Sequence, residues 1–185
     1  MRTALDRLYI VSGWLAAACL VLIALMVGVQ LVGRIVDGVM RQAGLRPYGF
    51  IVEGLAEIAG YLLVASSLLA LAPTLKAGSH IRVTMLLQNL GHRARTIFEL
   101  GAVGGALAFS IFMAWRLLLL TLDSWRFHEV SHGLVPIPLA YPQAAMFIGL
   151  AIFSIALLDE LLVVARSGRP SFSAAEDAVT LGKEG

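Results

Sequence analysis

Four long runs of apolar residues, separated by shorter polar segments, dominate the sequence. The first run, residues 8–33, contains no charged residue, and the 18 residues 58–75 are also free of Asp, Glu, Lys and Arg. About 20 consecutive apolar residues are enough for a helix to cross a lipid bilayer. The pattern therefore predicts an all-α integral membrane protein with four transmembrane helices.

The polar segments and turn residues set the predicted boundaries of these spans. Pro73 is expected near the end of the second span, where a kink costs least, and Pro136, Pro138 and Pro142 forbid a continuous helix before the fourth. The predicted order is an N-terminal segment 1–7, span 8–33, loop 34–50, span 51–75, loop 76–96, span 97–122, loop 123–141, span 142–165 and tail 166–185.

Within the loop 76–96, the sequence predicts a short helix lying on the membrane surface. Ser79 is a candidate N-cap, Ile81, Met85 and Leu90 recur at helical spacing, and Gly91 can end the helix. The fold class expected from the whole pattern is thus four transmembrane helices plus a short interfacial helix after the second span.

Composition supports a membrane protein and disfavours other classes. The chain is 59% hydrophobic and 14% charged, with a mean hydropathy of +0.85, whereas a soluble domain carries about 25% charged residues. The net charge of +2 could suggest nucleic acid, but the basic residues form no continuous stripe. They lie at the ends of the apolar runs, so we expect contact with lipids and not with nucleic acid.

Basic residues also predict the orientation of the chain. Arg and Lys gather in cytoplasmic loops, and the segments on the side of the termini hold nine of them against four on the other side. Both termini are therefore expected in the cytoplasm. The two sets are Arg2, Arg7, Lys76, Arg82, Arg93, Arg95, Arg166, Arg169 and Lys183, against Arg34, Arg41, Arg46 and Arg126.

Charged residues near the span ends are candidates for ion pairs between helices. Glu53 and Glu57, four residues apart, are predicted to share one helical face. Arg34 closes the first span on the same side, so a structural Arg34–Glu57 pair is predicted, with separate exposure of each to water as the alternative. Arg116 lies deeper and is expected to reach toward Asp123 or to face another subunit.

The third span carries a pattern that is typical of close helix packing. Gly101 and Gly105 form a Gly-x-x-x-Gly pair, with Ala108 near the same face. Small residues let another helix approach closely. The pair predicts a packing surface without naming the partner.

Residues His128-Glu129-Val130-Ser131-His132 match the H-E-x-x-H pattern of zinc proteases. That chemistry needs both histidines on one helical face and the glutamate as general base. Here Gly133 and the nearby prolines crowd the motif into a short loop, and no third ligand is evident. We favour an interfacial loop, and an intramembrane zinc metalloprotease with His128 and His132 as metal ligands is the alternative.

Other cofactors and reactions have less support. Haem can lie between histidines on facing helices of a four-helix protein, but all four histidines here lie in loops or at span ends. No Gly-x-Ser-x-Gly motif and no phosphate-binding loop occurs. The sequence thus favours a protein that is not an enzyme and holds no cofactor. The histidines are His80, His92, His128 and His132.

Three segments, in this order and spacing, resemble one family. They are the end of the first span at residues 25–34, the second span with its exit Gly78-Ser-His-Ile-Arg-Val83, and the loop reaching Val135-Pro-Ile-Pro138. Together they resemble the small membrane subunit of tripartite ATP-independent periplasmic (TRAP) transporters, the DctQ type. The residues that match by position are Gln30, Arg34, Glu57, His80 and Arg82.

The resemblance implies a function that hydropathy alone cannot give. Such subunits lie in the bacterial inner membrane beside a large permease subunit of the DctM type, which carries the substrate and sodium sites. A periplasmic binding protein of the DctP type delivers an organic acid. The small subunit is expected to act as a fixed scaffold without turnover of its own. The candidate interface residues are Gln30, Glu53, His80, Arg82, Gly101, Gly105 and Arg116.

Overall fold

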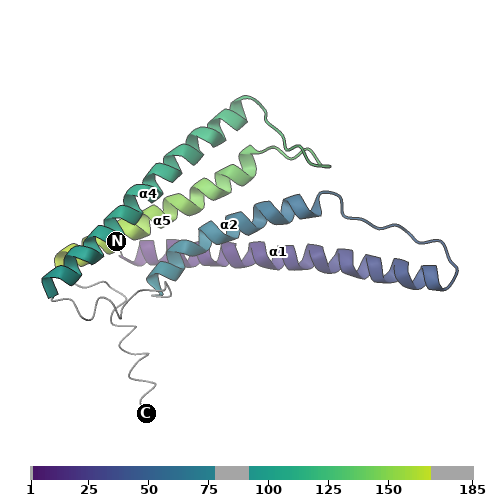
Figure 1. Cartoon of the computed structure of the whole chain (residues 1–185), viewed down its shortest axis with the longest axis horizontal. Coiled ribbons are helices and arrows are strands. Elements are labelled where there is room, and N and C mark those ends of the chain that lie inside the picture. Colours follow the sequence, from purple (N-terminus) through teal and green to yellow (C-terminus); the bar gives the residue numbers. More distant parts are fainter. Residues whose placement is uncertain (1, 78–91, 168–185) are drawn as a thin grey trace, which may run out of the picture.

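The computed structural model describes residues 2–77 and 92–167 (Figure 1). Its helices are α1 (Arg2–Gln42), α2 (Leu55–Lys76), α4 (His92–Arg126) and α5 (Ala140–Ser167). Each contains a stretch that is long and apolar enough to cross a membrane, so the prediction of an all-α protein with four spans is confirmed. The interfacial helix, His80, Arg82 and residues 168–185 of the tail lie outside the described residues.

The four helices form two pairs that meet along α2 and α5 (Figure 1). α1 packs on α2, and α4 packs on α5. The pairs lie close together at the N-terminal end of the bundle, where α1 and α4 begin, and they diverge toward the far end, where α2 and α5 begin. The molecule therefore has a packed end and an open end.

α1 continues well past the span predicted for it. Residues 34–42, assigned to a loop from the sequence, extend the helix to Gln42. It ends in a Schellman motif, in which Gly44 has φ +73° and the Leu45 N–H donates to the Met40 carbonyl (2.9 Å). The chain then folds back along α1, and the Tyr48 N–H donates to the Asp37 carboxylate (2.8 Å).

α2 begins at Leu55, four residues later than its predicted span. Gly54 precedes it at φ +70°, and the Val135 side chain lies 3.1 Å from where a Cβ on Gly54 would be, so both conformation and space favour glycine. Glu53 consequently lies in a turn and shares no helical face with Glu57, contrary to the prediction. Glu57 lies in the first helical turn, where the helix dipole favours a carboxylate.

The loop between α4 and α5 folds as a small hairpin closed by a single bridge. α4 runs to Arg126 and α5 begins at Ala140, beyond the predicted span limits of 122 and 142. Val130 and Pro138 form an isolated antiparallel bridge. The Ser131 N–H donates to the Ile137 carbonyl at 2.8 Å. Pro138 fits because the bridge does not use the N–H that proline lacks.

Buried residues gather mainly where the helix pairs approach each other. One cluster joins α1, α2 and α5, and a second joins α4 and α5. Three of the nine members are alanines, all in the first cluster, and they let α1, α2 and α5 come close. The first cluster is Tyr9, Ala16, Leu69, Ala72, Ile152 and Ala156, and the second is Val103, Leu107 and Leu157.

Candidate interaction surfaces

A proline in α2 explains a polar contact between α1 and α2. Pro73 has no N–H, so it cannot donate to the Leu69 carbonyl four residues earlier, as another residue would. The Ser12 hydroxyl of α1 donates to that carbonyl instead, at 2.5 Å. A second bond, from the Ser66 hydroxyl to the Ala16 carbonyl (3.1 Å), fixes the register of the pair.

The other helix contacts also depend on small or hydroxyl-bearing residues. A Cβ on Gly149 of α5 would lie 2.9 Å from backbone atoms of Leu68 and Leu69 in α2. Only glycine allows this approach without a shift of one helix. Between α4 and α5, the hydroxyls of Ser110 and Ser154 are 2.8 Å apart. None of these five interface residues, Ser12, Ser66, Ser110, Gly149 and Ser154, was singled out from the sequence.

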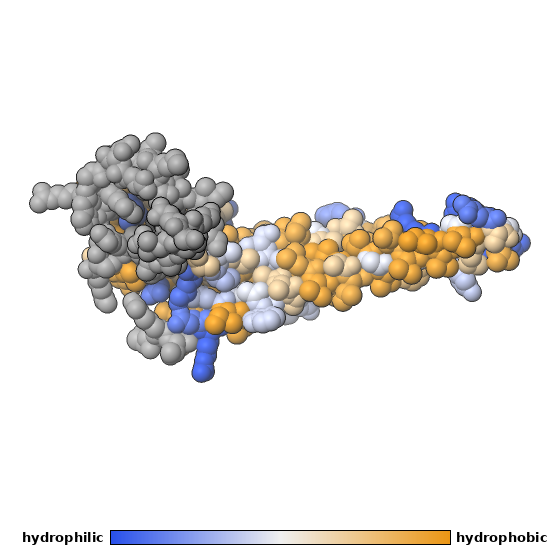
Figure 2. Space-filling model, turned by 90° about the horizontal axis from the view of Figure 1, so that it is seen from below, coloured by the Kyte–Doolittle hydropathy of each residue, from blue (hydrophilic) through white to orange (hydrophobic). Residues whose placement is uncertain are grey.

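The far half of α1, residues 20–39, exposes many large apolar side chains. Figure 2 shows apolar side chains over much of the visible face, with polar ones toward its two ends. Such a surface must be covered by lipid or by another membrane protein. The exposed residues are Leu20, Val21, Leu22, Leu25, Val27, Val29, Leu31, Val32, Ile35, Val36 and Val39.

α4 also has an uncovered face, and it includes the predicted glycine pair. A Cβ on Gly101 or Gly105 would meet nothing within 4 Å among residues 2–77 and 92–167. α4 turns Val103 and Leu107 toward α5 instead. Arg116 is exposed on α4 and makes no ion pair within the described ranges. The glycine face is thus free to accept a helix from outside the chain.

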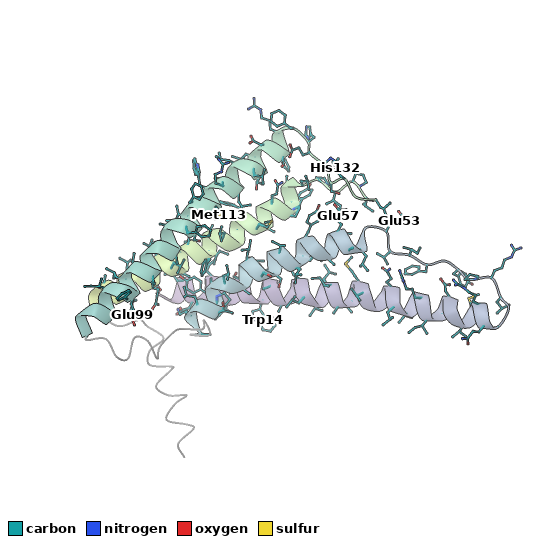
Figure 3. All side chains as sticks on the ribbon, viewed as in Figure 1. Trp14, Glu53, Glu57, Glu99, Met113 and His132 are labelled. Atoms are coloured by element: carbon teal, nitrogen blue, oxygen red, sulfur yellow. The ribbon has the colours of Figure 1, made fainter. Side chains whose placement is uncertain are left out.

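The Glu57 carboxylate lies beneath the far-end hairpin. It accepts a hydrogen bond from the Tyr61 hydroxyl (2.8 Å), and Ser131 and His132 are its polar neighbours in the hairpin. Figure 3 shows Glu57 and His132 near each other at the far end. A Cβ on Gly133 would collide with this carboxylate. Glu57 therefore connects the start of α2 to the loop between α4 and α5.

The predicted Arg34–Glu57 ion pair does not form in the described chain. Ser66 lies beside Ala16, so in an antiparallel pair Glu57 is level with about residue 25 of α1. Arg34 is nine residues further along, roughly 13 Å at 1.5 Å per residue. The Gln30 side-chain oxygen, between these levels, is buried without a hydrogen-bond partner among the described residues.

The zinc-protease alternative requires the H-E-x-x-H residues to lie on a helix. In the structure they do not. His128 takes φ 52° in the turn after α4, and the Glu129 carboxylate accepts the Ser124 hydroxyl at 2.6 Å. His132 lies beyond the bridge residue Val130, in the hairpin near Glu57. Within residues 2–77 and 92–167, no three His, Cys, Asp or Glu side chains gather as metal ligands would.

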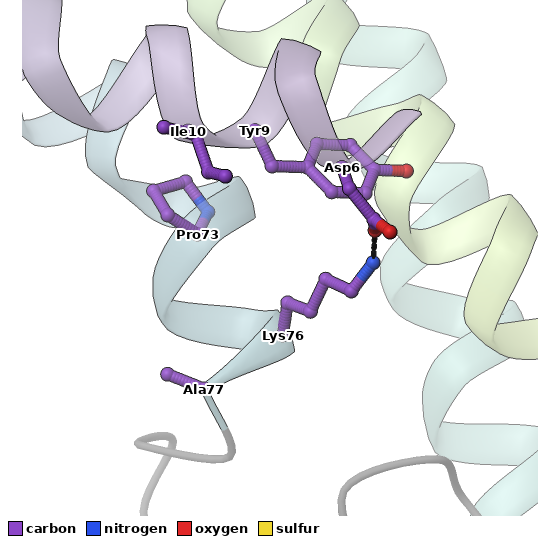
Figure 4. A pocket seen from close by; sticks show the side chains of 6 residues that line it. All are labelled: Asp6, Tyr9, Ile10, Pro73, Lys76 and Ala77. Atoms are coloured by element: carbon purple, nitrogen blue, oxygen red, sulfur yellow. Dashed lines mark ion pairs between the residues drawn. The ribbon is translucent and has the colours of Figure 1, made fainter. Parts of the chain in front are cut away.

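A cavity of about 440 Å³ opens between α1 and α2 at the N-terminal end (Figure 4). Asp6 and Lys76 form an ion pair across it, and the Lys76 ammonium lies 5.2 Å from the centre of the Tyr9 ring. The pair was not predicted, although the signal was present: opposite charges at the same end of antiparallel neighbours. The lining residues are Asp6, Tyr9, Ile10, Pro73, Lys76 and Ala77.

These features define a multi-pass helical membrane protein that leaves much apolar surface for lipid or for another membrane protein. A family model, the DctQ component of tripartite ATP-independent periplasmic transporters, matches residues 35–167. The match covers well over half of the chain, so the chain belongs to this family, as the resemblance predicted. No curated protein and no solved structure matches it.

Proposed function

We propose that this chain is the scaffold subunit of a TRAP transporter, without turnover of its own. It supports sodium-coupled uptake of an organic acid by a large permease subunit of the DctM type, which a periplasmic binding protein of the DctP type supplies. The complex lies in the bacterial inner membrane, with both termini of this chain in the cytoplasm. Besides the family, the observation that carries the proposal is the apolar surface of α1 and α4 that the chain leaves uncovered.

The glycine face of α4 is the surface best suited to a helix of the large subunit. Helices in lipid associate where small residues let their backbones approach, because lipid removes the hydrophobic drive. Gly101 and Gly105 provide such a place and pack against no other helix in the described part of the chain. The exposed rings of Phe98 and Phe109 flank them on α4 and would add contact area to the docked helix.

Co-purification with the large subunit tests this docking surface. Gly105→Leu fills the space that a partner helix needs but meets nothing in this chain, so the isolated subunit should fold normally while the complex is lost. Gly60→Leu, at a position on α2 that is equally open, is the matched control. Normal complex formation by Gly105→Leu, or equal loss with Gly60→Leu, would contradict the assignment to α4.

Reconstitution tests the scaffold role against the protease alternative. Uptake into proteoliposomes under a sodium gradient should require the large subunit, the binding protein and this chain together, and this chain alone should transport nothing. A variant carrying both His128→Ala and His132→Ala should retain uptake. Loss of an activity together with loss of one bound zinc per chain would overturn the proposal.

Cysteine labelling tests the orientation. In a Cys19→Ser background, single cysteines at Met40 and Val130 should react with a membrane-impermeant reagent added from the periplasmic side. Both positions lie at the far end of the bundle, opposite the start of α1 and the end of α5. Labelling of either one only from the cytoplasmic side would show that the orientation is wrong.

A further inference from the structure

The cavity between α1 and α2 at the N-terminal end has a charged rim and an apolar wall. Asp6 lies near the start of α1 and Lys76 is the last residue of α2. Ile10 and Pro73, about one turn deeper into the spans, line the same cavity. Polar groups at a span end with apolar groups below them match the boundary between lipid head groups and acyl chains.

The ion pair leaves binding capacity on both partners. The side chains of Lys76 and Asp6 are 45% and 43% exposed. An ammonium has three N–H donors and a carboxylate has two oxygens, so one contact uses only part of each. Figure 4 shows the two charged groups together at one side of the cavity. A positive and a negative group side by side complement a zwitterion, whereas a simple anion would be repelled by Asp6.

We propose that this cavity binds a zwitterionic phospholipid with a primary ammonium, the chemistry of phosphatidylethanolamine. Its phosphate binds the Lys76 ammonium, its ammonium binds the Asp6 carboxylate, and an acyl chain lies along Ile10 and Pro73. The ring of Tyr9 holds the Lys76 ammonium in place through a cation–π contact. The volume of about 440 Å³ lies within the range of about 300–1,000 Å³ that is typical of ligand sites.

Native mass spectrometry of the purified full chain measures this site directly. The protein is exchanged into nanodiscs with equal amounts of phosphatidylethanolamine, phosphatidylcholine and phosphatidylglycerol, and then released with its bound lipid. We expect phosphatidylethanolamine to be retained best, because its ammonium can donate hydrogen bonds to Asp6. Lys76→Gln and Asp6→Asn should each lower its retention about ten-fold, as expected for loss of one charge-assisted hydrogen bond.

Two further variants separate lipid binding from loss of the helix contact. Arg7→Gln, next to Asp6 but not in the cavity lining, should retain lipid as the natural chain does. Ile10→Trp fills the apolar part without changing a charge, and its position is 58% exposed, so it should fold and yet lose the lipid. Equal retention by the natural chain, Lys76→Gln and Ile10→Trp, or preference for phosphatidylglycerol, would overturn the proposal.

Discussion

The two halves of α1 carry similarly apolar sequences but lie in different surroundings. Toward the N-terminal end, Tyr9, Ser12 and Ala16 are buried against α2 and α5. In the far half, Leu25 and Val32 are each 60% exposed. The buried residues Ser12 and Ala16 are small, and Tyr9 and Ser12 carry a hydroxyl, whereas large aliphatic residues such as Leu15 (50% exposed) face outward even in the N-terminal half.

The contrast follows from the solvent. Lipid tails are as apolar as leucine, so burying leucine between helices gains little from the hydrophobic effect. Helices instead meet where small side chains let backbones approach and where a hydroxyl can satisfy a polar group. Size and hydrogen bonding, more than hydropathy, therefore decide which half of α1 packs within the chain and which half is left for lipid or a partner.

The largest expected effect comes from breaking the packed end at Gly149. Gly149→Leu pushes a side chain against the backbone of Leu68 and Leu69, and overpacking of this kind should destabilise the isolated subunit by about 3 kcal/mol. Thermal unfolding in detergent measures the change. Gly28→Leu on α1, where a Cβ meets nothing within 4 Å, is the control, and equal stability of the two variants would contradict the described α2–α5 crossing.

Replacing a packed leucine and an exposed leucine by alanine should lower the free energy of unfolding by unequal amounts. Leu69→Ala, at a side chain that is 5% exposed, should cost about 2 kcal/mol, at the low end for a buried leucine because lipid weakens the transfer contribution. Leu25→Ala should stay within about 0.5 kcal/mol in the isolated subunit. Thermal unfolding in detergent, with and without the large subunit, measures both variants. If Leu25→Ala destabilises only the complex, the far half of α1 lies at the subunit interface.

Removing the Ser12 hydroxyl should cost about 1 kcal/mol, as is typical of hydrogen bonds between membrane helices. Its acceptor, the Leu69 carbonyl, needs Ser12 only because residue 73 is proline. In a Pro73→Ala background the helix supplies its own donor, so Ser12→Ala should then have little effect. A double-mutant cycle on thermal unfolding measures this difference, and an unchanged cost in the alanine background would show that Pro73 is not the reason for the bond.

The smallest expected effect is the coupling between Arg34 and Glu57. Since the register separates them by roughly 13 Å, the effects of Arg34→Ala and Glu57→Gln should add within about 0.5 kcal/mol. A coupling of about 1 kcal/mol in the isolated subunit would reinstate the direct pair predicted from the sequence. Coupling seen only in the presence of the large subunit would place both residues at the interface.

The four spans could be predicted because a span depends only on the composition of about 20 consecutive residues. A soluble fold does not tolerate apolar runs of this length. Local turn chemistry holds a signal for the helix ends that the predicted bounds did not use, since Gly44 and Gly54 stand where α1 ends and α2 begins. The end of the first apolar run at Gly33 does not mark the end of α1, which continues through charged residues to Gln42. A helix does not need to end where its apolar run ends.

The partners of each residue could not be predicted, because apolar runs do not specify the register or rotation of one helix against another. Arg34 and Glu57 both lie near the same end of their predicted spans, yet the contact of Ser66 with Ala16 places them at different levels along the α1–α2 pair. The H-E-x-x-H pattern likewise gives spacing without conformation, and the turn at His128 makes a hairpin of it.

Pro73 also bears on the order in which the chain enters the membrane. A carbonyl left bare in hydrocarbon costs several kcal/mol, and the donor that satisfies the Leu69 carbonyl belongs to α1. Translation delivers the N-terminal helix first, so Ser12 is already in the bilayer when α2 arrives. The hydrogen bond that Pro73 removes from α2 is thus replaced by one from α1, a helix made earlier. The α1–α2 hairpin, and not the single helix, is therefore the natural unit of insertion.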